Sequence, residues 1–593
     1  MVRGDIPDLT RKEHDDYTEF KTTVTSRREL LGVLGAAGVT GIAGCTGGNE
    51  GDGTESAGSD LEDTDGDTRL TVGIQSEPWN FDPALHSDTG SALVMGLVYD
   101  KPIVIDPETN ELRADLCTEV PESIDDGQTW RYTLREGVTF HDGSEMTAED
   151  LAYNLNWVAD PENNATVLGY APQLENAETE IVDDYTVELT LNQPQSMWNS
   201  WMTRIIEGLV PADSRGELGE SKGPKGIGTD LTTDPIGTGP FEYEEWQTGS
   251  HVHMTAFDDH WRENVPHVDE FRFNIIVEAS SRLSQLRSGS SDMMKRVPAK
   301  DFGALESEPG ITTESVPGAR TLVTYTNLVD NGENPMSNVH NRRAVLHSVP
   351  TEEIVSRVFQ GQAIPQTGPW FPDSDWTSPK LKEMDLYDLD QAQAELEKGP
   401  DPDGFEVELM TENVSFYMNT AEIIQNQLSQ IGVDVEIVTL EKSSLFDRLY
   451  GNIGWELALN DWTNGIPHVM WWLFADKFPQ RNHNNWHHEP VDGELSDPWK
   501  PSGPAPPEYA QDEFGTEPGS GHLWFRSRIN EALQTTDTEA RREVAFELQE
   551  YIIDQAIAID ICYVNRIDAW QGSVEGYKFG RWSEEYMDVQ FNE

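Results

Sequence analysis

The sequence is poor in positive charge and in cysteine. Its 593 residues contain 41 Lys and Arg against 107 Asp and Glu, which gives a formal net charge of −66. A surface of this sign repels phosphate backbones, so we expect no nucleic-acid partner. Three cysteines are too few for a disulfide framework, and Cys117 and Cys562 remain either as a single bridge or as two buried thiols.

The common signatures of exported hydrolases are also missing or out of context. The chain has no HExxH string and no P-loop. A GxSxG string occurs at Gly219–Gly223, but it lies in a loop rich in Gly, Lys and Pro, without the strand and helix that a nucleophile elbow needs. We therefore expect no enzymatic activity and no cofactor, and an exported hydrolase remains the alternative from another class.

Despite its charge, the chain has ample material for a folded core. Hydrophobic residues make up 36% of it, including 18 Trp, 20 Phe and 16 Tyr. A chain of this length exceeds one compact core, so two or more lobes are expected. An acidic, Lys-poor surface over such a core is typical of a protein that works where salt screens self-repulsion, and we expect a halophilic source.

No hydrophobic run is long enough to cross a bilayer comfortably. The longest apolar stretch, 30–44, spans about 15 residues and follows the twin-arginine pair Arg27 and Arg28. It ends in small residues before Cys45, a pattern that resembles a lipobox whose cysteine is lipidated. We predict a signal over 1–44, with export by the twin-arginine route, and an acidic flexible tether over 45–68. Residues 1–25 are either an extended leader or the product of a mis-assigned start.

Local patterns predict structure in the region that follows the tether. Alternation predicts a strand over 70–74, and apolar spacing predicts a helix over 90–100. A further strand over 130–134 lies between two Asp-Gly turns. Thr147, followed three residues later by Asp150, indicates an approximate capping box at the start of the next helix.

The segment 130–155, WRYTLREGVTFHDGSEMTAEDLAYNL, closely resembles the signature of the family 5 extracellular solute-binding proteins, the dipeptide- and oligopeptide-binding group of ABC transporters. Its His141-Asp142 pair is therefore interpreted as part of a hairpin and not as a catalytic pair. Further matches follow in the family's order, so that the resemblance covers roughly 70–593. They lie at 234–241, 265–273, 342–348, 389–396 and 421–437. The first resembles a family turn whose glycines permit a sharp reversal before the next strand, and the match at 389–396 resembles a family helix.

The resemblance implies an α/β, two-lobe, periplasmic-binding-protein-like fold of class II, of the large family 5 type, with two hinge crossings. Lobe I would comprise 69–276 plus 560–593, and lobe II would comprise 277–559. The hinges would lie near 275–277 and 559–561, and closure of the lobes would trap the ligand.

Candidate ligand-binding residues also come from the resemblance. In peptide-binding members, an aspartate shortly after a tryptophan of the second lobe pairs with the peptide's amine. Here Trp462 is followed by Asn464, while the carboxylate, Asp461, precedes the tryptophan. This departure puts amine recognition in doubt. The candidates from this turn and from other positions that the family uses near the cleft are Trp79, Tyr99, Asn327, Trp370, Asp461, Trp462 and Asn464.

The resemblance implies a monomeric, lipid-anchored receptor on the extracellular face of the cytoplasmic membrane. It would deliver its ligand to an ABC permease and its ATPase. Peptides are the family's usual ligands, while oligosaccharides and nickel chelates remain open, as does a sensory receptor on the same fold. The segment 481–522 holds His483, His487, His488 and Glu489, which suggest either a metal site or a solvated loop over the cleft mouth. We predict no metal site.

Overall fold

The computed structural model describes residues 68–86, 88–170, 172–215, 231–451, 454–463 and 503–592. These residues belong to one unit, Asp67–His488 together with Trp499–Glu593. Several predicted features lie outside the described residues. They are the twin-arginine signal, Cys45 with its tether, the GxSxG string, Asn464, and the histidines His483, His487 and His488.

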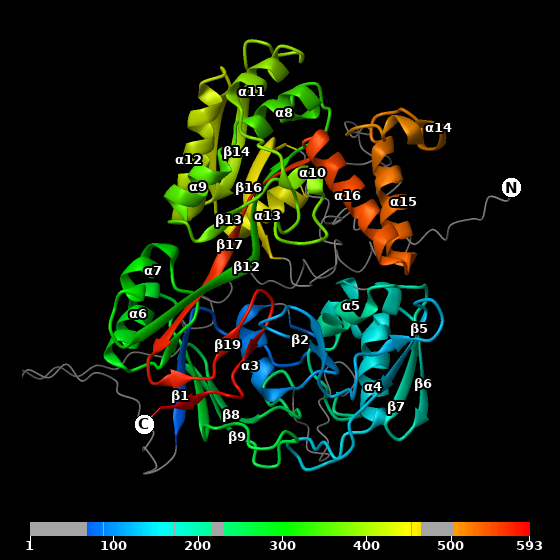
Figure 1. Cartoon of the computed structure of the whole chain (residues 1–593), viewed down its shortest axis with the longest axis vertical. Helices are drawn as coiled ribbons and strands as arrows, with labels where there is room; N and C mark the ends of the chain where they lie inside the picture. The colour runs from blue at the N-terminus through cyan, green and yellow to red at the C-terminus, as the bar shows by residue number, and fades with distance from the viewer. Residues whose placement is uncertain are drawn as a thin grey trace, which may run out of the picture. The chain divides into compact units, whose positions relative to one another are not determined.

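A mixed sheet of eleven strands runs through the unit (Figure 1). Its order is β15-β14-β16-β12-β17-β11-β1-β10-β9-β8, and β13 pairs with β17. Its strands are β1 (Arg69–Ile74), β8 (Phe241–Gln247), β9 (His251–Ala256), β10 (Glu270–Ile275), β11 (Met293–Met294), β12 (Ile311–Thr326), β13 (Ala363–Pro365), β14 (Glu406–Glu412), β15 (Asp434–Leu440), β16 (Leu457–Thr463) and β17 (Ala558–Gln571). Parallel pairs, such as β1 with β10, occur beside antiparallel ones, such as β12 with β17. This mixture confirms the predicted α/β class.

The long strands β12 and β17 connect the two ends of this sheet. They pair antiparallel from Ile311 opposite Gln571 to Tyr325 opposite Ala558, with a register shift between Val316 and Arg320. On one side of the shift β17 also pairs with β11, and on the other side with β13. Both strands therefore pass from one group of neighbours to the other.

Gly318 lies inside the register shift. A Cβ atom at this position would lie 2.2 Å from the carbonyl oxygen of Val564 on β17. No side chain fits at that distance, so the close approach of β12 to β17 requires glycine here.

The region between β10 and β12 packs against β1, β12 and β17. Helices α6 (Ala279–Ser288) and α7 (Ala299–Glu306) form a small core with β11 and with Ile567 and Ala569 of β17. The chain therefore continues to pack beside β1 after 275–277, and it first reaches the other group of strands through β12. The second predicted hinge, 559–561, lies inside β17, where Ile559 and Ile561 are core residues.

A smaller antiparallel sheet carries the segment of strongest family resemblance. Its order is β4-β5-β7-β6, and α4 packs on it with Leu151 and Leu155 in the core. The elements are β4 (Glu122–Ser123), β5 (Thr129–Thr133), β6 (Glu178–Asp183), β7 (Thr186–Thr190), α4 (Ala148–Ala159) and α5 (Trp198–Ile205). Helix α3 (Thr89–Val98) and the hairpin of β2 (Ile103–Ile105) with β3 (Leu112–Ala114) precede this sheet.

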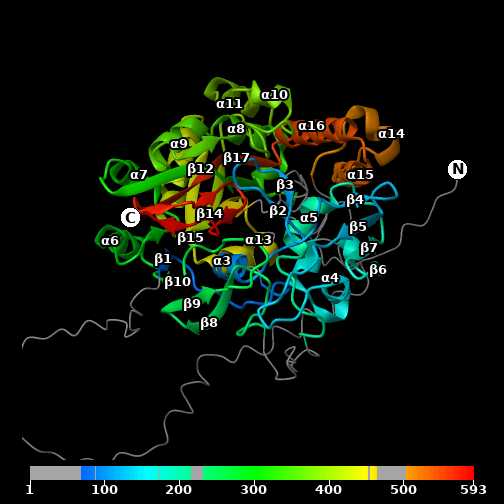
Figure 2. The same ribbon diagram turned by 60° about the horizontal axis from the view of Figure 1, so that its bottom comes forward.

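The helices of the second half pack around β14, β15 and β16 and along β17. They are α8 (Val339–His347), α9 (Thr351–Val358), α10 (Pro379–Lys382), α11 (Leu389–Leu396), α12 (Ser415–Ser429), α13 (Lys442–Gly451), α14 (Gln511–Phe514), α15 (Ser520–Gln534) and α16 (Thr538–Asp554). Both views show α15 beside α16 (Figures 1 and 2). The chain ends in the short strands β18 (Val574–Glu575), β19 (Lys578–Phe579), β20 (Glu584–Glu585) and β21 (Gln590–Phe591).

Most of the local predictions are confirmed. The strand over 70–74 is β1, and the helix over 389–396 is α11. The backbone N–H of Thr147 donates to the carboxylate of Asp150 at 2.7 Å, as a capping box requires. Cys117 and Cys562 are both buried free thiols, so they do not form the alternative bridge.

Among the described residues, no helix combines the length and the apolar character that a bilayer span requires.

Candidate functional site

A cavity of about 780 Å³ lies beside the point where β12 and β17 change neighbours. Its wall comes from distant parts of the chain: the end of β1, helix α3 and the β2–β3 hairpin, then the segments 295–300, 318–320, 357–360, 564–567 and 581–587. Phe416 and Asn419 of α12 and Thr463 of β16 complete it. The volume lies in the range typical of small-molecule sites.

The wall of this cavity carries an excess of positive charge. Eleven Lys or Arg residues line it: Lys101, Arg113, Arg204, Arg262, Lys295, Arg296, Lys300, Arg320, Arg357, Arg566 and Arg581. The acidic residues of the lining are five: Asp100, Asp115, Glu207, Glu584 and Glu585. In a chain with 107 acidic residues and 41 basic ones, the local balance is reversed.

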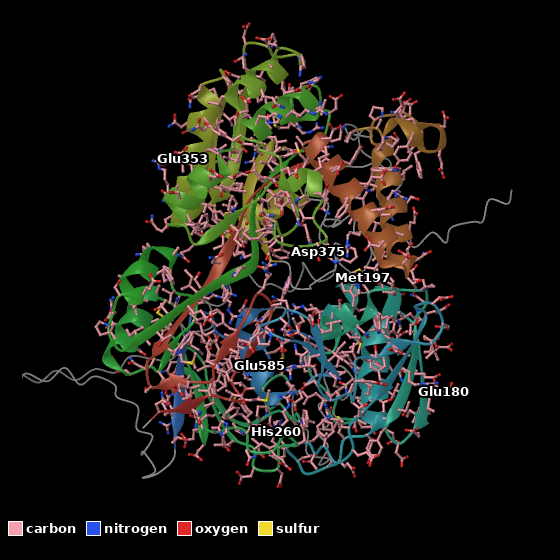
Figure 3. The ribbon with its side chains drawn as sticks, in the orientation of Figure 1. Glu180, Met197, His260, Glu353, Asp375 and Glu585 are labelled. Carbon is pink, nitrogen blue, oxygen red and sulfur yellow. The ribbon has the colours of Figure 1, made fainter. Side chains whose placement is uncertain are left out.

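One group of charges lies along the wall near α3. Arg262 pairs with Asp115, and Arg113 donates to Glu585, which is labelled in Figure 3. Burial and the neighbouring carboxylate of Asp100 raise the pKa of Asp115 to about 6. Burial alone would raise the pKa of Asp100 as well, but hydrogen bonds and charge from His260 lower it. These groups neutralise one another and need no ligand.

A second group ties β17 to the C-terminal strands. The ammonium of Lys295 donates to Asp568 at 2.6 Å, and it also donates to Glu584 and Tyr577. Arg566 pairs with the same Glu584. Burial and the charge of Arg566 lower the pKa of Lys295, whereas the two cations together hold the pKa of Asp568 below its ordinary value despite its burial. This network is structural.

A third pair faces the cavity from β12. The guanidinium of Arg320 donates to both carboxylate oxygens of Asp461, at 2.6 and 3.0 Å, and it lies 5.0 Å from the ring of Phe416. The two side chains come from neighbouring strands, because Arg320 is opposite Thr463 in the β12–β16 ladder. Asp461, the candidate amine partner from the sequence, therefore already has a cation beside it.

Arg296 differs from the other cations of the wall. Its backbone has a φ of 55°, in the left-handed region that an arginine rarely adopts. Nine of the eleven cations have a carboxylate within 4.0 Å. In the described part of the chain, the side chains of Arg296 and Lys300 have no such partner. Both are exposed to solvent through the cavity.

Of the candidates named from the sequence, Tyr99 lines the cavity, and its hydroxyl donates to the carbonyl of Phe81 at 3.1 Å. Glycines of the predicted turn at 234–241 pack against it: a Cβ atom on Gly237 would lie 2.1 Å from the carbonyl oxygen of Val98. The glycines are thus needed for this close packing, beyond the sharp reversal expected from the sequence.

Among the candidates whose side chains are described, Trp79, Asn327 and Trp370 lie outside the cavity lining. Trp79 is 70% exposed and lies outside the cavity lining. Asn327 is fully buried and donates to the carbonyl of Trp455 at 2.6 Å, and Trp370 is buried and donates to Ser374 at 3.1 Å. The side chain of Trp462 is not among those described, although its backbone pairs with Thr321. Ligand contact by these residues remains a prediction.

Sequence reasoning missed the cations of the wall. The adjacent pair Lys295 and Arg296, in a chain so poor in positive charge, was a signal that could have identified them. Among the described residues, no group of three His, Cys, Asp or Glu side chains could hold a metal ion.

Comparison with known proteins places this geometry in context. Residues 111–484 match the family described as bacterial extracellular solute-binding proteins, family 5 Middle. The glutathione-binding protein GsiB of Salmonella paratyphi A is 25% identical over 373 residues, which cover 63% of this chain and 69% of that protein.

Two solved structures share the fold at low sequence identity. The periplasmic binding protein DppA of Helicobacter pylori, in complex with the peptide STSA, has a TM-score of 0.68 and 21% identity, covering 88% of this chain and 98% of DppA. NikA of Brucella suis, in complex with Fe(III)-EDTA, has a TM-score of 0.72 and 17% identity, covering 89% of this chain and all of NikA.

Proposed function

From the premise that the chain belongs to family 5 of the bacterial extracellular solute-binding proteins, we propose that it captures a peptide-like solute for an ABC importer. The observation that carries this proposal is the cavity of about 780 Å³ beside the crossing of β12 and β17. A site of this size, lined by both groups of strands, suits a solute that both groups must contact at once. The names of the matched proteins GsiB and DppA, which bind glutathione and a peptide, support a peptide-like solute.

The proposed mechanism is closure of two lobes about the paired strands β12 and β17. We place the boundary at the register shift between Val316 and Arg320 and at the facing residues of β17, instead of at 275–277 and 559–561. This placement is supported by the packing of α6 and β11 beside β1 and of α7 on β12 and β17. Two crossings of this kind permit a hinge motion of two stable bodies, and the ligand stabilises the closed state. The permease would recognise that closed state.

The proposal includes a lipid anchor outside the cytoplasmic membrane. Export by the twin-arginine route and lipidation of Cys45 rest on the order of arginine pair, apolar run and cysteine in the sequence. We expect Cys45→Ala to release the protein from membranes into the medium. If that variant stays in the membrane fraction to the same extent, Cys45 is not the anchor.

Capture itself is tested by thermal unfolding of the purified protein in molar KCl with three panels: short peptides, oligosaccharides, and metal chelates such as Fe(III)-EDTA. A ligand present at 100 times its Kd adds about 2.7 kcal/mol to the free energy of unfolding. Stabilisation by peptides is the expected result. Stabilisation by sugars or chelates alone would replace the peptide with that class, and a folded protein that no panel stabilises would contradict the proposal.

A further inference from the structure

The charge of the cavity wall indicates which solutes fit it. Among the described residues, eleven Lys and Arg line this cavity, against five Asp and Glu, in a chain that has 41 basic and 107 acidic residues. Most of these cations have protein partners, so the count by itself does not define a ligand site. The candidates for ligand binding are therefore the two cations without a described partner, Arg296 and Lys300.

Arg296 is the most informative of these residues. Its side chain lines the cavity and has no hydrogen bond or ion pair with any described residue. Burial lowers its pKa, as does the positive charge of Arg566. It nevertheless keeps accessible surface, because the cavity opens beside it. A partly desolvated cation without a counter-charge is unfavourable, and an anion in the cavity would offset this cost.

The backbone holds Arg296 in place. The N–H of Lys295 donates to the carbonyl of Gly73 at 3.1 Å, and that of Val297 donates to the carbonyl of Ile567 at 2.8 Å. The N–H of Arg296 itself donates to the carboxylate of Asp568 at 2.9 Å. These hydrogen bonds hold the backbone of Arg296 in the left-handed conformation, and no hydrogen bond or ion pair of its side chain with a described residue requires that conformation. Strain of this kind, where the surroundings enforce it, occurs preferentially at ligand sites.

The surroundings of Arg296 favour an anion over an amine. Asp568 and Asp461 both influence Arg296 electrostatically, but Lys295 and Arg566 pair with Asp568, and both oxygens of Asp461 accept hydrogen bonds from Arg320. Lys300, in the first turn of α7, also lines the cavity without a partner. The cavity therefore offers positive charge without a partner among the described residues, and the two carboxylates that influence Arg296, Asp568 and Asp461, are each paired with other cations.

We propose that the cavity takes a solute with a net negative charge and that a carboxylate of this solute pairs with Arg296. The inference rests on the proposed function, because it names the charge class of the solute that the same cavity would capture. A planar guanidinium held in a fixed position suits a carboxylate, which it can bind through two parallel hydrogen bonds.

Matched probes that differ only in charge test this inference. We would measure the affinity of the purified protein by titration calorimetry for Glu-Ala-Glu, Ala-Ala-Ala and Lys-Ala-Lys, and for trigalacturonate and cellotriose. The salt should be 1 M KCl, where the Debye length is about 3 Å, so that only close pairs contribute. The acidic member of each series should bind about 30-fold more tightly than its neutral counterpart.

A variant separates binding from structure. Arg296→Asn removes the charge and places at this position a residue that tolerates the left-handed conformation, so the protein should unfold at the same or a higher temperature. It should nevertheless lose the preference for acidic probes, about 30-fold in affinity. Arg296→Lys should retain part of that preference. The matched control is Arg287→Asn on α6, which removes an exposed cation outside the cavity lining and should leave every affinity unchanged.

The outcomes distinguish the two proposals. Equal affinity for acidic and neutral probes, or an unchanged preference in Arg296→Asn, would overturn the anionic class while capture of a solute stands. If none of the five probes binds, the anionic class is overturned. The proposed function also fails if, in addition, the folded protein is not stabilised by any panel.

Discussion

The chain as a whole and the wall of its cavity have opposite charge. The whole sequence has a net charge of −66, whereas basic residues outnumber acidic ones eleven to five among the described residues of the cavity lining. The overall charge is the property expected of a protein in a salt-rich medium, and it carries no information about the ligand. The local reversal shows that the net charge of the whole chain does not predict the charge of the cavity wall. It also raises the question of which cavity cations hold the fold and which are available to a ligand.

The largest expected effect of a substitution at the wall concerns a cation that holds the fold. Lys295→Met should lower the free energy of unfolding by about 3–5 kcal/mol, because Asp568 and Glu584 would lose their buried ammonium partner. Denaturant unfolding at pH 7 measures it. A loss below about 1 kcal/mol would mean that Arg566 alone neutralises both carboxylates.

The same network gives a pH dependence. The pKa of Asp568 is below its ordinary value, so this group contributes stability that is present above its unfolded pKa of about 4 and is lost as the pH falls further. Unfolding followed between pH 6 and pH 3 should show this loss in the native protein. The loss should be smaller in Lys295→Met.

The second prediction concerns the crossing that positions the two sides of the wall. Gly318→Ala should lower the free energy of unfolding by about 1–3 kcal/mol, because its methyl group would meet the carbonyl oxygen of Val564. The matched control is Gly303→Ala in α7, where no atom lies within 4 Å of the added carbon, and which should stabilise by up to about 1 kcal/mol. Equal effects of the two substitutions on thermal unfolding would contradict the close approach at Gly318.

The buried carboxyl group of Asp560 should make stability depend on pH. Asp560 of β17 is buried, its Oδ2 atom has no hydrogen-bond partner, and burial raises its pKa to about 7. A carboxyl with a raised pKa is protonated preferentially in the folded state, so its effect on stability becomes unfavourable as the pH rises from about 4 to about 7. Asp560→Asn should therefore stabilise the protein by about 2 kcal/mol at pH 8 and have little effect at pH 4. A stabilisation that does not change with pH would argue against this titration.

The smallest effect is expected for an exposed cation at the cavity rim. Arg357 pairs with Glu353, labelled in Figure 3, but 67% of its side chain is exposed. Pairs of this kind contribute little in water, so Arg357→Ala should change the free energy of unfolding by less than about 0.5 kcal/mol. A change above about 1 kcal/mol in denaturant unfolding would show that the rim cations are not equivalent to ordinary surface charges.

The sequence was a good guide to local structure and to the family. Short-range patterns were sufficient for β1, α3 and the capping box of Thr147 and Asp150, since the interactions that define them lie within a few residues. The same patterns did not identify where the chain crosses between the groups of strands. The length of β12 depends on its pairing with β17, more than 230 residues away at the closest pair.

The candidate site shows the same limit. Asn327 and Trp370 were inferred by position from the family resemblance, yet their polar atoms have partners in the core and they lie outside the cavity lining. Nothing local to Asp461 indicated that Arg320, 141 residues away, would take both of its oxygens. Partners at such distances become neighbours only through strand pairing.

By itself, then, the sequence determined the family and the α/β class through its resemblance to known motifs, and the net charge through its composition. It also determined most of the short-range elements, because periodicity and turn residues are properties of neighbouring positions. Only the tertiary structure decided which cations surround the cavity and which of them lack a partner. Arg296 is held in its unusual conformation by backbone bonds to Gly73, Ile567 and Asp568, and the arrangement of these groups exists only when the distant segments have packed together.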